Sequence, residues 1–306
     1  MEAFRGHAAE AYAISYFGAL IIVALLESVV PRRAPGDTLP LRWFSNVAIT
    51  ILNTLLLRVL FPIAGVAWAL VCSERGWGLL NSVSWPTWVH YAAAILVLDL
   101  YAYGQHYLLH RVNVLWRLHR THHSDQEYDL TTGLRFHPLE MVFTTLFQMC
   151  VLAALGAPPL AVLVSQLIAT VVTFVEHANV SIPARLDRLL RVVLVTPDMH
   201  RIHHSAASGE SQSNFSNTFS WWDRLFGTYI DQPAAGHANI RFGVEGFGAR
   251  KHLTLPWMLA QPFLQEPESR GEIPRVISAD AVRTPRPAGP LHSAHGHRQE
   301  PPSVRS

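Results

Sequence analysis

Ten of the chain's 17 histidines form one ordered series of closely spaced groups. The first group has the spacing His-x-x-x-His, and two later groups share the spacing His-x-x-His-His. Residues three and four apart lie on one face of a helix, so each group can direct its imidazoles at a common point. The series consists of His106, His110, His119, His122, His123, His137, His177, His200, His203 and His204.

This series predicts a metal centre with more than one ion. Neutral imidazole is the commonest protein metal ligand and suits iron, zinc, copper and nickel. Ten imidazoles exceed what one ion can coordinate, so the natural count is two ions. A lone histidine in an apolar region is usually a satisfied core residue, but that interpretation does not account for two repeats of His-x-x-His-His.

The ligand set contains nitrogen and no thiolate, which fits a non-haem iron pair that activates O2. Cys72 and Cys150 lie in apolar stretches and form no Cys-x-x-Cys motif. Polar side chains near the histidines are interpreted either as acceptors for imidazole N–H groups or as helix caps and other structural residues. These are Asp99, Glu140, Glu176, Asn179, Asp198 and Asp223.

The composition favours a membrane-embedded protein. The 306 residues are 50% hydrophobic and 15% charged, with a mean hydropathy of +0.18, whereas soluble domains are about 25% charged. A net charge of +2 is too small to suggest a nucleic-acid partner. We expect an all-α, multi-pass membrane bundle of about four to five spans, with a helical cap that carries the histidines.

Four apolar regions supply the expected spans, each of which needs about 20 residues. Ala11–Val30 lacks a basic leader and is interpreted as a retained helix. Phe44–Cys72 is either one kinked helix or two short re-entrant pieces. Trp88–Tyr103 runs directly into the first histidine group. Met141–Val175 is a hairpin of two short spans, because the prolines in Gly156–Pro159 stop a helix.

The hairpin returns His177 to the side of the membrane on which His137 lies, so all ten histidines can meet at one face. The opposite loop, residues 73–87, holds only Arg75 against Glu74. Arginines gather instead on the histidine side, which the positive-inside rule assigns to the cytoplasm. They are Arg32, Arg33, Arg42, Arg111, Arg117 and Arg120.

Residues 1–265 are expected to form one membrane-embedded domain, with the histidine core at about residues 90–230. Within it, Pro183–Thr196 is either a helix in the membrane interface or an ordinary solvated helix, with Arg185, Arg188 and Arg191 on its polar side. Residues 266–306 are rich in proline, arginine, glycine and serine, which predicts a disordered tail.

The three histidine groups, their order and the hairpin between the second and third resemble the fatty acid hydroxylase/sterol desaturase superfamily of integral membrane enzymes. The resemblance covers roughly residues 90–230. Its matching stretches are Asp99–Arg111, Leu115–Ser124, Arg135–Glu140, Glu176–Asn179, Pro197–Ser205 and Trp222–Tyr229.

The resemblance implies that the ten histidines occupy the family's metal-binding positions. They would hold two iron ions, for which zinc can substitute on purification, and no catalytic residue is predicted beyond these ligands. It also implies a small helical bundle with a cytoplasmic cap. The first group has three intervening residues, unlike the four of some sphingolipid-type fatty acid hydroxylases.

Members of this superfamily hydroxylate or desaturate lipids with O2. We therefore expect hydroxylation of an unactivated C–H bond of a lipid such as a sterol or fatty acyl chain, with desaturation at the same site as the alternative. No cytochrome b5-like domain is visible, so electrons would come from a separate cytochrome b5-, ferredoxin- or reductase-type protein.

Two other classes of protein fit the pattern less well. A metal-handling transporter or sensor would bury its ligands at mid-membrane, whereas these histidines follow the spans. A bis-histidine haem protein needs single histidines that face each other across helices and not consecutive pairs.

Overall fold

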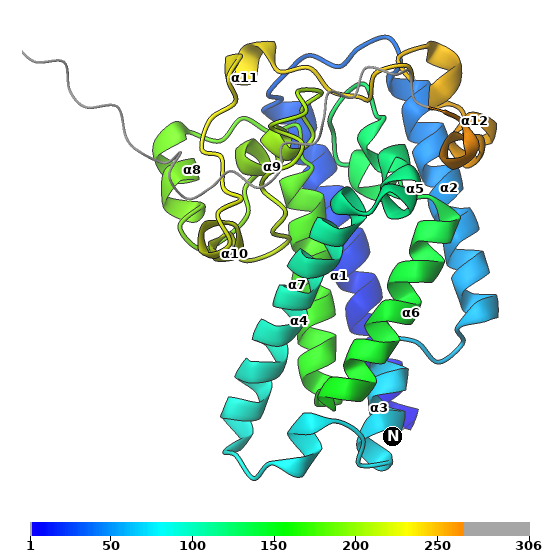
Figure 1. Ribbon diagram of the computed structural model, residues 1–306, viewed down its shortest axis with the longest axis vertical. Helices are drawn as coiled ribbons and strands as arrows, with labels where there is room; N and C mark the ends of the chain where they lie inside the picture. Colours follow the sequence, from blue (N-terminus) through cyan, green and yellow to red (C-terminus); the bar gives the residue numbers. More distant parts are fainter. Residues whose placement is uncertain (1, 266–306) are drawn as a thin grey trace, which may run out of the picture. The chain divides into compact units, whose positions relative to one another are not determined.

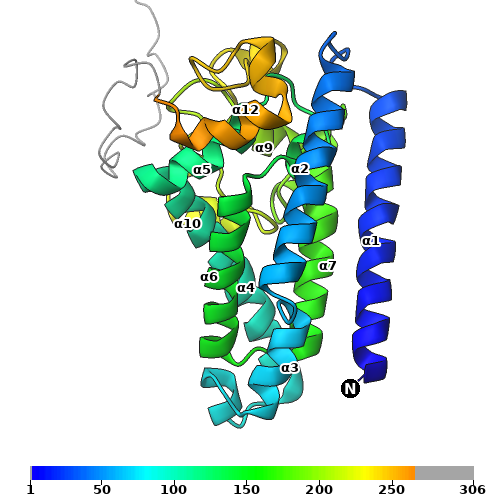
Figure 2. The same ribbon diagram turned by 90° about the vertical axis from the view of Figure 1, so that its right-hand side faces the viewer.

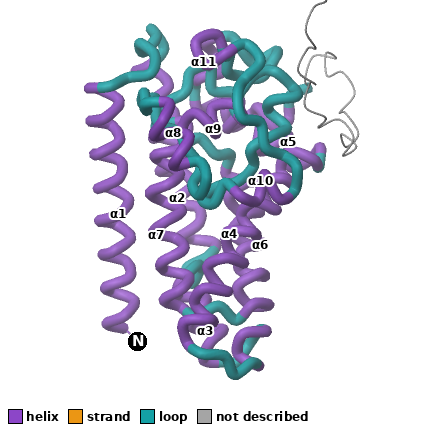
Figure 3. Tube along the Cα trace, turned by 90° about the vertical axis from the view of Figure 1, so that its left-hand side faces the viewer, coloured by secondary structure: helices purple, strands orange, loops and turns teal. Residues whose placement is uncertain are grey.

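The computed structural model describes residues 2–265, with side chains from Gly6 onward. Helices joined by loops make up this part of the chain, and no strand occurs in it (Figure 3). The predicted tail, residues 266–306, lies outside the described residues. The five long helices are α1 (Glu2–Val29), α2 (Leu39–Leu60), α4 (Thr87–Arg111), α6 (Pro138–Leu155) and α7 (Pro159–Glu176).

Shorter helices gather at one end of the long ones and form a cap (Figure 1). The cap contains α5 (Asn113–His123), α8 (Ala184–Leu190), α9 (Pro197–His203), α10 (Trp221–Leu225), α11 (Gly236–Asn239) and α12 (Leu255–Ala260). It also holds the 3-10 turns η2 (Thr132–Leu134), η3 (Arg250–Leu253) and η4 (Gln261–Phe263), while α3 (Val66–Glu74) and η1 (Leu79–Ser82) lie at the opposite end.

Four helices within the described residues are long and apolar enough to cross a membrane: Gly6–Val29 of α1, and α2, α6 and α7 in full. Their surfaces expose large apolar side chains, among them Phe17, Leu55 and Val59. Such surfaces are costly in water and favourable in lipid. The prediction of an all-α membrane bundle is therefore confirmed.

The second apolar region, Phe44–Cys72, contains one span and one short helix. Helix α2 ends at Leu60, the chain turns at Phe61–Gly65, and α3 has only nine residues, too few to cross a bilayer. Pro62 lies in this turn and cannot donate a helical hydrogen bond. The chain therefore crosses once here, as the predicted sidedness requires.

The expected third span lies within α4 but does not reach the apolarity of the other four. Its 25 residues are long enough to cross. Asp99 and the histidines toward its end make α4 more polar than the other four helices. Helix α4 lies alongside α7 (Figure 1), with Ala94 and Leu98 in the same buried cluster as Ala161 and Val162 of α7.

The predicted hairpin of Met141–Val175 is confirmed, because α6 and α7 are separated by a tight turn at Gly156 (Figure 2). Gly156 adopts a left-handed conformation with φ of 67°, which glycine reaches without steric cost. A Cβ atom here would also lie 2.5 Å from the carbonyl oxygen of Trp77. The turn is therefore fixed against the loop at the far end of the bundle from the cap.

A buried ionic network ties the cap to α2. The guanidinium of Arg42 donates to Asp125 at 2.5 Å and to Asp129 at 2.7 Å. Arg135, also fully buried, donates from Nε to the carbonyl oxygen of Thr121 in α5 at 2.8 Å. Buried ions persist only when paired and hydrogen-bonded. This network therefore holds the end of α5 and the loop that follows it in place.

The predicted helix over Pro183–Thr196 is much shorter, since α8 covers only Ala184–Leu190. Its three arginines do not share a polar face. Arg185 and Arg188 are exposed, whereas Arg191 is buried and pairs with Asp187 at 2.5 Å. The prediction of one arginine face is wrong, because that buried ion pair turns Arg191 inward.

Candidate metal centre

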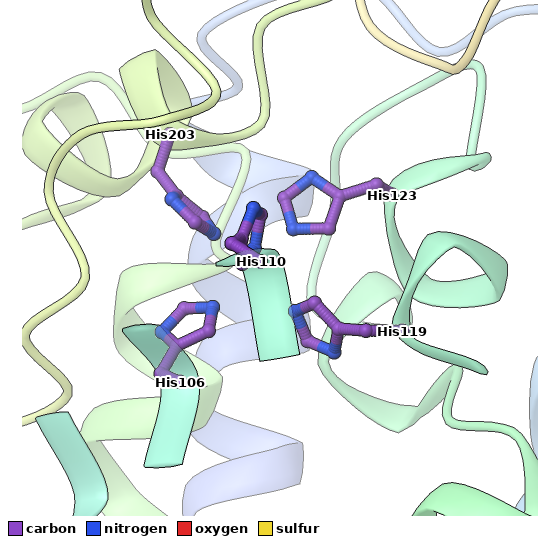
Figure 4. A group of neighbouring side chains, drawn as sticks. All are labelled: His106, His110, His119, His123 and His203. Carbon is purple, nitrogen blue, oxygen red and sulfur yellow. The ribbon is translucent and has the colours of Figure 1, made fainter. Parts of the chain in front are cut away.

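The structure brings nine of the ten histidines into two adjacent groups, within each of which the ligand nitrogens all lie within 4.8 Å of one another. We call them the five-histidine group and the four-histidine group. The first, shown in Figure 4, contains His106, His110, His119, His123 and His203. The second contains His122, His177, His200 and His204.

Each His-x-x-His-His repeat contributes to both groups, which the spacing alone did not predict. In α5, His119 and His123 belong to the five-histidine group, whereas His122 belongs to the other. Consecutive residues differ by about 100° around a helix. His123 therefore lies only about 40° from His119, while His122 points about 60° to the other side. In the second repeat, His203 likewise belongs to the five-histidine group, whereas His200 and His204 belong to the four-histidine group.

The hydrogen bonds of the five-histidine group leave Nε2 available as the metal-binding atom. Nδ1 of His106 lies 2.9 Å from the carbonyl oxygen of Phe215, and Nδ1 of His203 lies 2.7 Å from that of Ser213. A carbonyl can only accept, so both Nδ1 atoms carry the proton. The Nε2 atoms of both rings are buried and have no hydrogen-bond partner within the described residues. Metal-ligating histidines are oriented in this way.

Nδ1 of His119 has a stronger partner, the carboxylate of Glu140 at 2.7 Å. The sequence analysis proposed Glu140 as an acceptor for an imidazole N–H group, and this contact is confirmed. Both side chains are nearly fully buried. A carboxylate bonded to Nδ1 fixes the ring and makes its other nitrogen a better donor to a metal.

In the four-histidine group, Nε2 of His177 lies 3.3 Å from Nε2 of His122 and 3.2 Å from Nε2 of His200. Nδ1 of His177 donates to the carbonyl oxygen of Thr173, so its Nε2 has no proton to share with either ring. With metal–nitrogen bonds of about 2.1 Å, neighbouring ligand nitrogens lie roughly 3.0 to 3.4 Å apart in octahedral or tetrahedral coordination. The spacing therefore fits a shared ion.

Burial keeps these imidazoles in the neutral form that binds metals. It lowers the pKa of His122, His123, His200 and His204 well below the usual value, and neighbouring histidines lower it further. Burial lowers the pKa of His203 to about 3. Protons therefore do not compete for these nitrogens at neutral pH.

This burial predicts that the metal-free protein loses stability as the pH falls below about 6.5. In the unfolded chain the imidazoles bind protons near that pH, whereas in the folded protein His203 stays neutral down to about 3. The unfolded state then holds more protons, so the free energy of unfolding decreases with falling pH. Thermal denaturation of chelator-treated protein at about pH 7.5 and about pH 5.5 measures this. Equal midpoints would contradict it.

His137, the tenth predicted ligand, lies outside both groups. Its Nδ1 accepts a hydrogen bond from the backbone N–H of Leu139 at 3.1 Å and so caps α6. Its Nε2 lies 3.2 Å from the carbonyl oxygen of Leu259. Both ring nitrogens are thus occupied by the protein itself, and we leave His137 out of the proposed ligand set.

The other predicted acceptors do not hydrogen-bond to a histidine of either group. Asp223 acts on His106 indirectly. It accepts hydrogen bonds from the backbone N–H groups of Phe215 and Ser216 and so positions the carbonyl of Phe215, which accepts from Nδ1 of His106. Asp99 accepts from the Trp222 indole at 2.8 Å. The remaining carboxylates are Asp198, paired with Arg32, and Glu176, 3.7 Å from Nδ1 of His177.

Sequence reasoning missed the backbone carbonyls of Phe215, Ser213 and Thr173, which orient three of the histidines. Every residue carries such a carbonyl, so no sequence signal marks them. It also missed Phe136, whose ring stacks on His122 with centroids 4.5 Å apart. The one available signal was its place directly before His137, in the stretch Arg135–Glu140 that resembles the family.

Replacing Glu140 with glutamine is expected to weaken metal binding about 10- to 100-fold, because a neutral amide polarises His119 less than a carboxylate does. The amide oxygen can still accept from Nδ1, so the fold is expected to remain. Competition with a chromogenic chelator measures the affinity. An affinity within about twofold of the wild type would show that the contact serves packing alone.

Comparison with known proteins agrees with this geometry. Residues 91–228, which contain all ten predicted ligands and the whole hairpin, match the fatty acid hydroxylase family. By this match and by its relatives, the chain is similar to the fatty acid hydroxylase superfamily. The resemblance proposed from the histidine spacing is thereby confirmed. No solved structure matches the chain at a significant level.

Three of the proteins to which the chain is similar are named for an oxidation of a lipid. The chain is 27% identical to ornithine lipid hydroxylase of Rhizobium tropici over 82% of this chain and 75% of the relative. It is 31% identical to alkylglycerol monooxygenase of Homo sapiens over 49% of this chain and 33% of the relative. For cholesterol 25-hydroxylase of Rattus norvegicus the identity is 26%, over 47% and 48%. The chain thus spans only about a third of the alkylglycerol monooxygenases it matches.

Proposed function

We propose that this protein is an O2-dependent lipid hydroxylase whose nine grouped histidines hold two iron ions. The observation that carries the proposal is the pair of buried, all-imidazole groups, each with nitrogens close enough to share an ion. Histidine is a ligand that suits iron, zinc and copper alike. Iron is favoured over zinc because the related proteins are named as hydroxylases and monooxygenases, and zinc has no redox chemistry with which to activate O2.

Bound iron would supply the one-electron and O2 chemistry that no amino-acid side chain provides. In the overall reaction, one oxygen atom enters a lipid C–H bond and the other leaves as water, with electrons and protons from a donor. We propose a separate cytochrome b5-, ferredoxin- or reductase-type protein as that donor.

The chain's own residues hold the ligands and exclude water. His110 is buried between the rings of Trp116, 4.9 Å away, and Phe215, 5.2 Å away. Phe136 covers His122 on the other side of the centre. Shielding of this kind excludes bulk water from the centre. Glu140 and the backbone carbonyls hold His106, His119, His177 and His203 in the tautomer that binds a metal.

Lipid analysis of cells with and without this protein tests the proposal. Hydroxylation adds one oxygen atom to a lipid, and label from 18O2 must appear in that product. Desaturation at the same site would instead remove two hydrogens without label. Cells that express a His203→Ala variant at the same level provide the control. No new oxidised lipid in cells with folded, metal-loaded protein would refute the proposal.

We also propose that residues 1–265 form one membrane-embedded domain with the metal centre on the cytoplasmic face. The nine histidines come from the ends of α4 and α7 and from the cap helices α5 and α9, all at one end of the bundle (Figure 1). Arginines beside that end favour the cytoplasm.

Cysteine labelling is expected to place the cap in the cytoplasm. Ser208→Cys in the cap and Ser84→Cys at the far end are both exposed sites, in a background without Cys72 and Cys150. An impermeant thiol reagent should label only position 84 in intact cells and position 208 after permeabilisation. Labelling of position 208 in intact cells would reverse the orientation.

A further inference from the structure

Arg201, in the helix that carries His200 and His203, is fully buried at 0% exposure. None of its Nε, Nη1 and Nη2 atoms has a hydrogen-bond partner within the part of the chain that the structure describes. Its guanidinium instead lies over the rings of Tyr128, at 5.4 Å, and Phe242, at 5.3 Å. Arginine stays charged at any physiological pH. A buried cation without a polar partner calls for a missing ion or ligand.

Two further arginines lie beside Arg201, on the segment that follows α1. Arg32 pairs with Asp198 at 3.2 Å. Arg33 donates from Nη2 to the carbonyl oxygen of His237 at 2.7 Å and also lies over the ring of Phe242, at 5.2 Å. The segment is held in place by Asn179, whose side chain bonds both the N–H and the carbonyl of Arg33. The cations are therefore fixed by the fold and not brought together by chance.

His237 faces the same group. Both of its ring nitrogens are buried without a hydrogen-bond partner among the described residues, and Nδ1 lies 4.0 Å from Oδ1 of Asp198. Burial lowers the pKa of His237, Arg32 and Arg201 lower it further, and Asp198 raises it. Oδ1 of Asp198 is also unpartnered. Several unsatisfied polar atoms thus converge at one place.

The charges of this group do not cancel. Arg32, Arg33 and Arg201 supply three positive charges and Asp198 one negative charge, which leaves two positive charges uncompensated. A guanidinium fork matches the oxygens of a phosphate or carboxylate and binds them with charge-assisted hydrogen bonds. Such an anion would satisfy Arg201 and cancel the excess charge.

We propose that Arg201, Arg32, Arg33 and His237 form a binding site for one phosphate group, either free or on a lipid headgroup. The ring of Tyr128 separates this site from the four-histidine group, because it also contacts His177 at 5.8 Å and His204 at 5.2 Å. The proposal does not depend on lipid hydroxylation. It can be tested by binding alone.

The test uses the purified full chain in neutral detergent and measures its thermal midpoint. Potassium phosphate is titrated against potassium chloride at equal ionic strength, and phosphatidic acid against phosphatidylcholine in mixed micelles. A ligand that binds only the folded state raises the midpoint with its concentration. Arg32→Gln and Arg201→Met probe the site, and Arg188→Gln, at an exposed arginine of α8, is the matched control.

We expect phosphate or phosphatidic acid to raise the midpoint of the wild type and the control alike. Arg32→Gln should need about tenfold more of the same ligand, since it removes one charged partner. A response to phosphatidic acid alone identifies a lipid headgroup, and a response to inorganic phosphate identifies a free anion. Arg32 is 22% exposed in its side chain, so its replacement tests the site even where Arg201→Met does not fold.

Phosphate can also coordinate a metal, so the difference between variants decides the outcome. If Arg32→Gln and the control respond equally, the stabilisation comes from elsewhere and the proposal is overturned. It is also overturned if neither ligand stabilises the wild type beyond its matched salt or lipid. Because no turnover is measured, failure here leaves the hydroxylase proposal untouched.

Discussion

Replacing His122, His123, His203 or His204 with alanine is expected to lower lipid oxidation at least about 100-fold. Each variant removes one imidazole from a buried group whose ligand nitrogens lie close enough to share an ion. The protein should still insert, because hydrophobic spans and not these histidines drive insertion. Product formed per mole of membrane-inserted protein is the measurement.

His137→Ala is the matched control for these four variants. His137 belongs to the same sequence series but lies outside both groups and caps α6. Its loss is expected to cost about 1 kcal/mol of stability as a lost helix cap and to leave turnover close to normal. Near-normal turnover in the four variants would mean that the groups are not catalytic. Complete inactivity of His137→Ala would return that residue to the ligand set.

Elemental analysis is expected to find about two iron atoms per chain in protein from iron-replete cells, since each group offers enough imidazoles for one ion. His110→Ala is expected to weaken the ion of the five-histidine group, and His200→Ala that of the four-histidine group. Each variant should therefore retain about one ion per chain, because the other ligand group remains complete.

Zinc in place of iron would alter the identity but not the count, since imidazole binds both. Tail histidines could add adventitious metal, so a chain shortened after residue 265 is analysed in parallel. Folded protein without metal would refute the two-ion proposal. A single ion in the wild type, lost in both variants, would show that the two groups act as one site.

The sequence by itself determined which residue types carry the chemistry. Ten histidines, eight of them at helical spacing, predicted an all-imidazole centre, and nine of the ten meet in the structure. It also determined the membrane bundle, because the length and apolarity of a span are local properties of the chain. The hairpin was predictable for the same reason, since proline and glycine act on their own backbone.

Only the tertiary structure decided how the histidines are divided. Spacing shows that His119, His122 and His123 share one side of a helix, but not that His122, about 60° around it from His119, belongs to a different group. That division depends on where α9 and the end of α7 pack against α5, which is set by contacts between distant residues. His137 lies outside both groups for the same reason, since its position beside Leu139 and Leu259 arises from packing.

The phosphate site was likewise outside the reach of the sequence. In the sequence, Arg32 and Arg33 are charges that flank a span, and Arg201 is an unremarked position within the second His-x-x-His-His repeat. Their meeting depends on the pairing of Pro31 with Val180 and on the hydrogen bonds of Asn179. Pairing between segments so far apart in the chain has no local signature. The sequence determines the chemistry of each residue, whereas the tertiary structure determines which residues become its neighbours.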